Sequence, residues 1–185
     1  MHTIELIVAG SWLVLIVVWI VAAVALGIGG IGRTSTLGRV VRLLLVVAVW
    51  VAVGYGYRLP APGSTPTMFD LAAVGASLCV AGCAFAIWAR FSLGRSWGMP
   101  MTKHAAPELV TAGPYRFVRH PIYTGILFML VGTSLLHPIA ALPSAAFIGY
   151  FVYSARREEG DMERQFPDAY PAYKRRSKML IPFLV

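Results

Sequence analysis

Two short blocks of the sequence bring together charged and aromatic side chains that could bind a small charged ligand. The first block, Leu109 to Gly125, reads LVTAGPYRFVRHPIYTG and leads into a long hydrophobic stretch. Pro121 suits the first turn of a helix, where its missing N–H costs nothing. The free N–H groups of that turn and the helix dipole favour an anion such as a carboxylate, close to Arg119 and His120. The alternative for this block is a basic anchor at the membrane surface, with its tyrosines in the interfacial aromatic belt.

The second block, Arg156-Arg157-Glu158-Glu159, follows that hydrophobic stretch. Two adjacent carboxylates can simply belong to a solvated helix surface. If the stretch instead forms a hairpin, its two ends lie on one side of the membrane, and Arg119-His120 comes close to Glu158-Glu159. Such a cluster could hold a small zwitterionic ligand that also carries hydroxyl groups. Arg and His would bind the carboxylate of the ligand, and Glu its ammonium or ribose hydroxyls.

Composition indicates what kind of protein must position these blocks. Hydrophobic residues make up 58% of the 185 residues and charged residues 13%, about half of the roughly 25% that is usual in soluble proteins. A soluble fold of this length could not bury so much apolar surface, and the same excess excludes an intrinsically disordered chain. We therefore predict an integral membrane protein, whose net charge of +8 first of all reflects membrane topology.

Four stretches with little or no charge could supply the membrane helices. They are Leu6 to Gly32 (apolar as far as Ile28), Leu43 to Tyr57, Leu71 to Ala89 and Pro121 to Ala155. The last is too long for one crossing, since about 20 apolar residues span a bilayer as a helix. We expect it to form a tight helical hairpin that turns near His137-Pro138. The predicted fold is an all-α integral membrane protein with five transmembrane helices, the last two forming the hairpin, and a cytoplasmic site for a small polar ligand.

Basic residues set the orientation of these five helices. All of the 16 Lys and Arg residues except Arg58 fall in segments that five crossings place on one side. The positive-inside rule then puts the N-terminus outside and the C-terminus in the cytoplasm. We predict one membrane domain, residues 1–185, in which residues 1–89 form three scaffold helices. Residues 90–185 form a polar loop, where we expect the chemistry, then the hairpin and a C-terminal cytoplasmic segment.

Three other patterns are better explained by structure than by ligand binding. Gly27 to Gly32 fits G-x-G-x-x-G, but it ends a membrane helix and lacks the preceding strand that dinucleotide binding needs. Cys79 and Cys83 share one helix face and have no His or carboxylate near them in sequence. We interpret the two cysteines as packing residues and predict no metal site. The basic clusters are those that membrane insertion requires, so we predict no nucleic-acid partner.

The two polar blocks together also carry a family resemblance. LVTAGPYRFVRHPIYTG, the hydrophobic hairpin, REEGDMERQFPDAYPAYKRR and the closing Pro182-Phe183 resemble the isoprenylcysteine carboxyl methyltransferase family and, more loosely, the phospholipid N-methyltransferases. The resemblance covers Pro107 to Phe183, whereas the first three predicted helices match only in character. It implies S-adenosylmethionine-dependent methyl transfer in the membrane. The cofactor would enter from the cytoplasm, and a lipophilic small molecule or lipid acceptor from the bilayer.

The resemblance also implies roles for individual residues. Arg119, or Arg156 from the other end of the hairpin, would orient an acceptor carboxylate. The cofactor-binding residues would be Leu109, Val110, Gly113, Tyr115, His120, Tyr123, Glu158 and Glu159. The sequence departs from the family at two places. Phe166-Pro167 replaces the usual Phe-Gly, and the loop around Trp97 lacks the Asn and His of eukaryotic members, which leaves the acceptor open.

The acceptor decides what chemistry the protein must supply. A carboxylate is already a nucleophile, so methyl transfer to it needs alignment and exclusion of water rather than a base. A phospholipid amine would have to be neutral and a thiol ionised, and both are alternative acceptors. An NADPH-dependent membrane reductase and a non-enzymatic membrane scaffold are alternatives from other classes of protein. The small size and short loops favour a prokaryotic plasma membrane.

Overall fold

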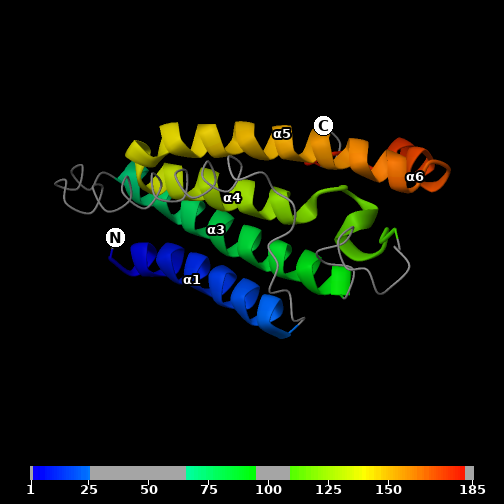
Figure 1. Cartoon of the computed structure of the whole chain (residues 1–185). Helices are drawn as coiled ribbons and strands as arrows, with labels where there is room; N and C mark the ends of the chain where they lie inside the picture. Colours follow the sequence, from blue (N-terminus) through cyan, green and yellow to red (C-terminus); the bar gives the residue numbers. More distant parts are fainter. Residues whose placement is uncertain (1, 26–65, 95–108, 182–185) are drawn as a thin grey trace.

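The computed structural model describes residues 2–25, 66–94 and 109–181, and every regular element in these ranges is helical (Figure 1). The four long helices are α1 (His2–Ala25), α3 (Pro66–Leu93), α4 (Pro121–Leu136) and α5 (Ala141–Gln165). The short elements are the 3-10 helices η2 (Gly113–Arg116) and η3 (Pro138–Ala140) and the α-helix α6 (Ala169–Arg176). The predicted all-α class is therefore confirmed.

Three stretches of helix are long and apolar enough to cross a membrane. They are His2–Ala22, Phe69–Leu93 and Pro138–Gln165. The apolar helix α4 is shorter, with 16 residues. The crossing predicted at Leu43 to Tyr57 lies outside the described residues. The structure thus supports three of the five predicted crossings by length and composition.

The long helices lie side by side and alternate in direction only from α3 onward. α1 and α3 run in the same direction, α4 runs back along them and α5 returns, as the colours in Figure 1 show. The indole Nε1 of Trp12 in α1 donates to the hydroxyl of Thr133 in α4 at 3.0 Å, which ties the first helix to the others. This arrangement brings the start of α4 and the ends of α3 and α5 to one end of the molecule.

α3 and α4 approach each other closely because glycine faces glycine at two levels. A Cβ atom built on Gly82 would lie 2.5 Å from the carbonyl oxygen of Gly125, and one built on Gly75 would lie 2.5 Å from that of Gly132. The two glycines of each helix are about two turns apart, so both contacts lie on the same pair of helix faces. Small residues permit such close backbone approach between membrane helices, whose association depends on packing.

The two cysteines pack in this same interface, as predicted. Cys79 and Cys83 are free thiols buried in the core between α1, α3 and α4. The thiol of Cys79 donates to the carbonyl oxygen of Met129 at 3.4 Å, and that of Cys83 to the carbonyl oxygen of Ser11 at 3.3 Å. Within the ranges that the structure describes, no group of three or more His, Cys, Asp or Glu residues could hold a metal ion.

The chain turns between α4 and α5 at the predicted break. The backbone N–H of His137 donates to the carbonyl oxygen of Thr133 at 2.8 Å and closes the last turn of α4. Pro138 then starts η3, because its ring cannot continue the preceding helix. α5 packs back against α4 through a stripe of buried residues that ends with Ala155 and Glu159. This stripe turns the Glu159 side chain toward the start of α4.

Candidate functional site

The polar site lies where α3 ends, α4 begins and α5 runs past both (Figure 1). η2 leads the chain into α4 and begins at Gly113, whose φ of 61° is in the left-handed region. A Cβ atom on Gly113 would lie 2.6 Å from the hydroxyl oxygen of Ser92 on α3. Glycine therefore permits both the backbone conformation and the close packing of η2 on α3.

A C-terminal strap, which we define as residues 177–181, runs beside the chain that enters α4. The backbone N–H groups of Arg119 and His120 donate to the carbonyl oxygens of Lys178 and Met179, at 2.8 and 3.1 Å. The phenol of Tyr173 on α6 also donates to the carbonyl oxygen of Tyr115 at 2.6 Å and strengthens this junction. The strap therefore fixes the backbone of two predicted site residues from a distant part of the sequence.

The guanidinium of Arg119 is held by acceptors within the protein. Its Nε donates to Glu159 Oε1 at 2.6 Å, and its Nη1 donates to the carbonyl oxygens of Lys174 and Ser177. Only 9% of the Arg119 side chain and 7% of the Glu159 side chain are exposed. Because these groups are buried, loss of either partner would leave an uncompensated charge. The structure thus gives Arg119 a partner on α5 that the sequence prediction did not assign to it.

His120 lies between the two glutamates of the second block. Its Nδ1 is 3.5 Å from Glu158 Oε2, and its Nε2 is 3.7 Å from Glu159 Oε1. Burial by itself lowers the pKa of His120, but the interactions with the two carboxylates outweigh burial and raise the pKa above its ordinary value. Nε2 is buried and makes no hydrogen bond within the described part of the chain, since its 3.7 Å distance from Glu159 Oε1 is too long for one.

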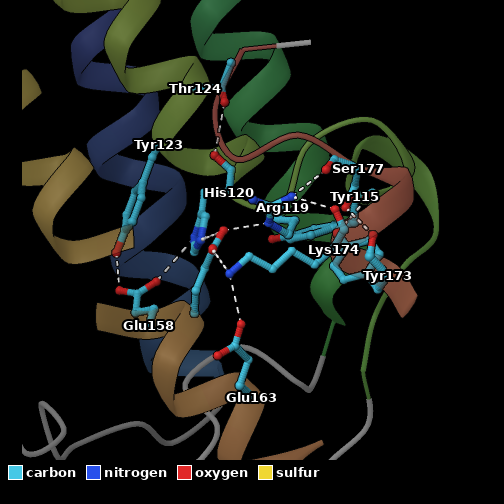
Figure 2. A network of polar contacts seen from close by, with 11 residues as sticks. Tyr115, Arg119, His120, Tyr123, Thr124, Glu158, Glu163, Tyr173, Lys174 and Ser177 are labelled. Carbon is cyan, nitrogen blue, oxygen red and sulfur yellow. Dashed lines mark hydrogen bonds and ion pairs between the residues drawn. The ribbon is translucent and has the colours of Figure 1, made fainter. Parts of the chain in front are cut away.

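Tyr123 and Glu158 form the outer edge of the cluster (Figure 2). The phenol of Tyr123 donates to Glu158 Oε1. The Tyr123 ring stacks on the imidazole of His120 with 5.5 Å between ring centroids. Nearly half of the Glu158 side chain, 49%, is exposed, in contrast to buried Glu159. Glu158 is therefore the more accessible of the two carboxylates.

Aromatic rings continue from this edge into the apolar part of the helix pair. The centroid of the Tyr123 ring lies 4.8 Å from that of Phe151, and the Phe151 ring lies 6.0 Å from that of Phe147, one turn earlier in α5. Both phenylalanines pack with apolar residues of α4 and of the strap. The polar cluster is thus joined directly to the buried apolar core that α4, α5 and the strap form together.

Lys174 on α6 completes the ion-pair network (Figure 2). Its Nζ lies 3.2 Å from Glu159 Oε2 and 2.9 Å from Glu163 Oε1. Both glutamates raise the pKa of Lys174 above its ordinary value, with the hydrogen bond to Glu163 as the larger contribution. In the sequence, Lys174 counts only toward the basic charge of the C-terminal segment. Tyr170, Tyr173 and Ser177 are spaced three and four residues apart, and all three are buried. This helical spacing is the sequence signal that could have shown that α6 packs on the site.

The structure brings five of the ten predicted site residues into direct contact with one another. Arg119, His120, Tyr123, Glu158 and Glu159 form one connected cluster. The other predicted residues lie around it: Tyr115 is buried, Gly113, Leu109 and Val110 are partly buried at or before η2, and Arg156 is exposed on α5. The ion pairs described for the cluster do not include Arg156, so its role in orienting an acceptor is still a prediction.

Three curated proteins are similar to this chain over part of their length. Protein-S-isoprenylcysteine O-methyltransferase B of Arabidopsis thaliana is 34% identical over 80 residues, which are 42% of this chain and 41% of that protein. Methanethiol S-methyltransferase 1 of Bradyrhizobium diazoefficiens is 35% identical over 77 residues, 42% of this chain and 27% of that protein. The nickel-cobalt-cadmium resistance protein NccN of Alcaligenes xylosoxydans xylosoxydans is 31% identical over 97 residues, 50% of this chain and 45% of that protein.

The chain therefore spans less than half of the length of each of these relatives. No solved structure matches it. The sequence profile of the phospholipid methyltransferase family matches residues 71–169. This range contains α3 from Leu71 onward, α4, α5 and the cluster of Arg119, His120, Tyr123, Glu158 and Glu159, and it ends at the first residue of α6. Because this match covers more than half of the 185 residues, the protein belongs to the phospholipid methyltransferase family.

Proposed function

We propose that the protein is a membrane-embedded methyltransferase that uses S-adenosylmethionine and acts on a lipophilic acceptor, in the first place a carboxylate. The observation that supports this function is the cluster of Arg119, His120, Glu158 and Glu159 at one end of the apolar helices, in a chain of the phospholipid methyltransferase family. The cluster offers both signs of charge to a zwitterionic cofactor, and it lies at the end of helices that are apolar enough to stand in a membrane, where a lipophilic acceptor would be found.

In this proposal the chain crosses a membrane five times, with the polar site on the cytoplasmic side. α1 and α3 run in the same direction (Figure 1), so the chain between them has to return to its starting side. We assign this return to the apolar run Leu43 to Tyr57. α4 and α5 form the tight hairpin, and its open end carries the site. The basic residues then place the N-terminus outside and the C-terminus in the cytoplasm, in a prokaryotic plasma membrane.

The residues of the cluster fit the polar groups of S-adenosylmethionine. The carboxylates of Glu158 and Glu159 can accept hydrogen bonds from an ammonium or from ribose hydroxyls. The buried Nε2 of His120 can donate to the carboxylate of the cofactor. When bound, the cofactor supplies a methyl group activated by its sulfonium. The proposed pocket is completed by Leu109, Val110, Gly113, Tyr115 and Tyr123.

The part of the protein in the reaction is then alignment and exclusion of water. A carboxylate acceptor needs no catalytic base. This agrees with the cluster, in which the charged side chains are paired with one another. We assign its orientation to Arg156 before Arg119, because Arg156 is exposed on α5 whereas Arg119 would have to release Glu159. A loosely held guanidinium suits this role, since the charge of the acceptor disappears when the ester forms.

Binding of radiolabelled S-adenosylmethionine to the purified full chain in lipid nanodiscs tests the cofactor. We expect saturable binding of S-adenosylmethionine and no competition by NADPH. H120A should weaken binding about five- to 150-fold, the equivalent of about 1–3 kcal/mol for an unsatisfied polar partner. D161N is a matched control, since Asp161 is an exposed carboxylate on α5 that pairs with Arg164. Binding of NADPH instead would indicate a membrane reductase, and binding of neither would favour a scaffold.

The class of acceptor can be identified by whether alkali cleaves the bond between the acceptor and the transferred methyl group. Three candidate acceptors should be supplied in turn with labelled cofactor: a carboxylic acid that carries a prenyl thioether, a small lipophilic thiol and an aminophospholipid. Methyl esters release methanol in alkali, whereas thioethers and methylated amines do not. Alkali-labile product supports the carboxylate acceptor, and R156M should raise the KM for that acceptor without changing cofactor binding. Stable label on the thiol would favour S-methylation, for which the similarity to methanethiol S-methyltransferase 1 provides a reason.

A further inference from the structure

Each oxygen of the Glu159 carboxylate has its own cation. Oε1 accepts from Arg119 Nε at 2.6 Å, and Oε2 lies 3.2 Å from Lys174 Nζ. The carboxylate is buried, with 7% of the side chain exposed. His120 Nε2 lies further from Oε1, at 3.7 Å, so a cofactor group that bonds to Glu159 would have to share or replace Arg119 or Lys174, its two closer cations.

The two cations differ in how firmly they are held. Arg119 is itself buried, and two backbone carbonyl oxygens hold its guanidinium in addition to Glu159. Lys174 is 43% exposed, and its Nζ is closer to Glu163, at 2.9 Å, than to Glu159. Loss of the bond to Glu159 would leave Arg119 with an incompletely paired buried charge, whereas Lys174 would keep an ion pair and contact with water.

We propose that Lys174 occupies the place on Glu159 Oε2 that a donor group of the cofactor takes, and that it withdraws to Glu163 when the cofactor binds. Lys174 is then a positioning residue, which keeps the buried carboxylate paired and competes with the cofactor for it. This inference rests on the proposed function, because it assumes that Glu159 binds S-adenosylmethionine.

The charge of the ligand gives this competition a measurable signature. S-adenosylmethionine carries a sulfonium and therefore one positive charge more than its product, S-adenosylhomocysteine. A lysine near the site disfavours the sulfonium form more than the neutral thioether. Removal of Lys174 should consequently strengthen binding of both molecules, and strengthen that of S-adenosylmethionine more. A lysine that only supported the fold would weaken both when removed, by the same factor.

The test is equilibrium binding of both molecules to the full chain in nanodiscs. For K174M we expect the Kd of S-adenosylmethionine to fall about two- to fivefold, the range of a partly exposed ion pair, with a smaller fall for S-adenosylhomocysteine. K174R, which retains the charge, should restore the wild-type ratio of the two Kd values. R175M is the matched control, because it removes an adjacent exposed cation while the described partners of Glu159 are Arg119, His120 and Lys174. R175M should leave the ratio at its wild-type value.

A second variant acts on the other partner of Lys174 and does not disturb a buried group. E163Q leaves Lys174 bound to Glu159 alone, so the Kd of S-adenosylmethionine should rise in the wild-type background. In the K174M background, E163Q should change the Kd of S-adenosylmethionine little. If E163Q acted only by removing a negative charge, it would raise the Kd by the same factor in the wild type and in K174M.

Three results would overturn the inference: an unchanged or higher Kd in K174M, equal changes for both molecules, or an effect of E163Q that does not depend on Lys174. Each of these presupposes that the wild-type protein binds S-adenosylmethionine. If it does not, the proposed function fails and the inference fails with it.

Discussion

The guanidinium of Arg119 and the carboxylate of Glu159 form a buried ion pair between the entrance of α4 and the end of α5, with 2.6 Å between Nε and Oε1. The pair connects the two polar blocks and also reaches the strap through Ser177. Its stability is therefore linked to three separate segments of the chain. The same pair sets the orientation of a carboxylate that we assign to cofactor binding.

R119M should destabilise the protein strongly, because it removes the closest cation from the buried Glu159 carboxylate and leaves only the partly exposed Lys174 and the more distant His120 beside it. We expect a loss of about 3–5 kcal/mol in the free energy of unfolding, the usual result of breaking a buried pair from one side. Denaturant titration in detergent would measure it. R164M removes an arginine from an exposed pair with Asp161 and should cost no more than about 1 kcal/mol. The double variant R119M/E159M should be more stable than R119M, and a purely additive loss would contradict the proposed coupling.

His120 should make the stability of the protein depend on pH. Its pKa is raised in the folded protein, so the protonated imidazole contributes stability that is fully present below the ordinary histidine pKa. This contribution is lost as the pH rises through the raised pKa. The Tm of the wild type should therefore fall over this interval relative to H120Q. H2Q changes an exposed histidine at the other end of the molecule and should follow the wild-type curve. Parallel curves for wild type and H120Q would show that His120 does not interact with the glutamates as described.

The facing glycines of α3 and α4 should tolerate no side chain. In G82A the new methyl group would meet the carbonyl oxygen of Gly125 at 2.5 Å, so the helices would have to move apart. We expect a loss of about 1–3 kcal/mol, as for other overpacked cores, measured as a lower Tm in detergent. A Cβ atom built on Gly149 in α5 would meet nothing within 4 Å, so G149A should leave the Tm unchanged or raise it. Equal effects of the two substitutions would mean that the close contact contributes nothing.

Thr124 should be required for docking of the strap. Its hydroxyl is buried and donates to the carbonyl oxygen of Leu180 at 2.5 Å. T124V keeps the shape of the side chain but leaves that carbonyl unsatisfied, at a cost of about 1–3 kcal/mol. Limited proteolysis should then cut the C-terminal segment faster, and T124S should restore protection. Unchanged protection in T124V would show that the backbone bonds at Arg119 and His120 are sufficient to hold the strap.

The sequence predicted the long helices and the two polar blocks for physical reasons that hold locally. Charge-free stretches define apolar helices, and His137-Pro138 interrupts a stretch that is too long for one crossing. Two helices joined by such a short turn lie side by side, so the residues at their open ends meet. This reasoning anticipated that Arg119 and His120 would lie near Glu158 and Glu159, as the structure shows.

The partners of individual side chains could not be predicted in the same way. η2 and α6 are short, and the backbone bonds between the strap and the entrance of α4 join residues about sixty positions apart without any compositional signal. The sequence therefore suggested a ligand for Arg119, whereas the structure shows internal acceptors. Lys174 was hidden for a related reason: in a run of three basic residues, only the packing of α6 distinguishes the one that faces Glu159.

The strap also imposes an order on biosynthesis. Residues 177–181 are translated after all the helices described here, yet they supply carbonyl oxygens to Arg119 and His120 at the entrance of α4. Insertion of the helices into a membrane can precede completion of the polar cluster, but the cluster can acquire its full set of bonds only after the ribosome has passed this segment. Membrane insertion and maturation of the site are consequently separate events in the life of the protein.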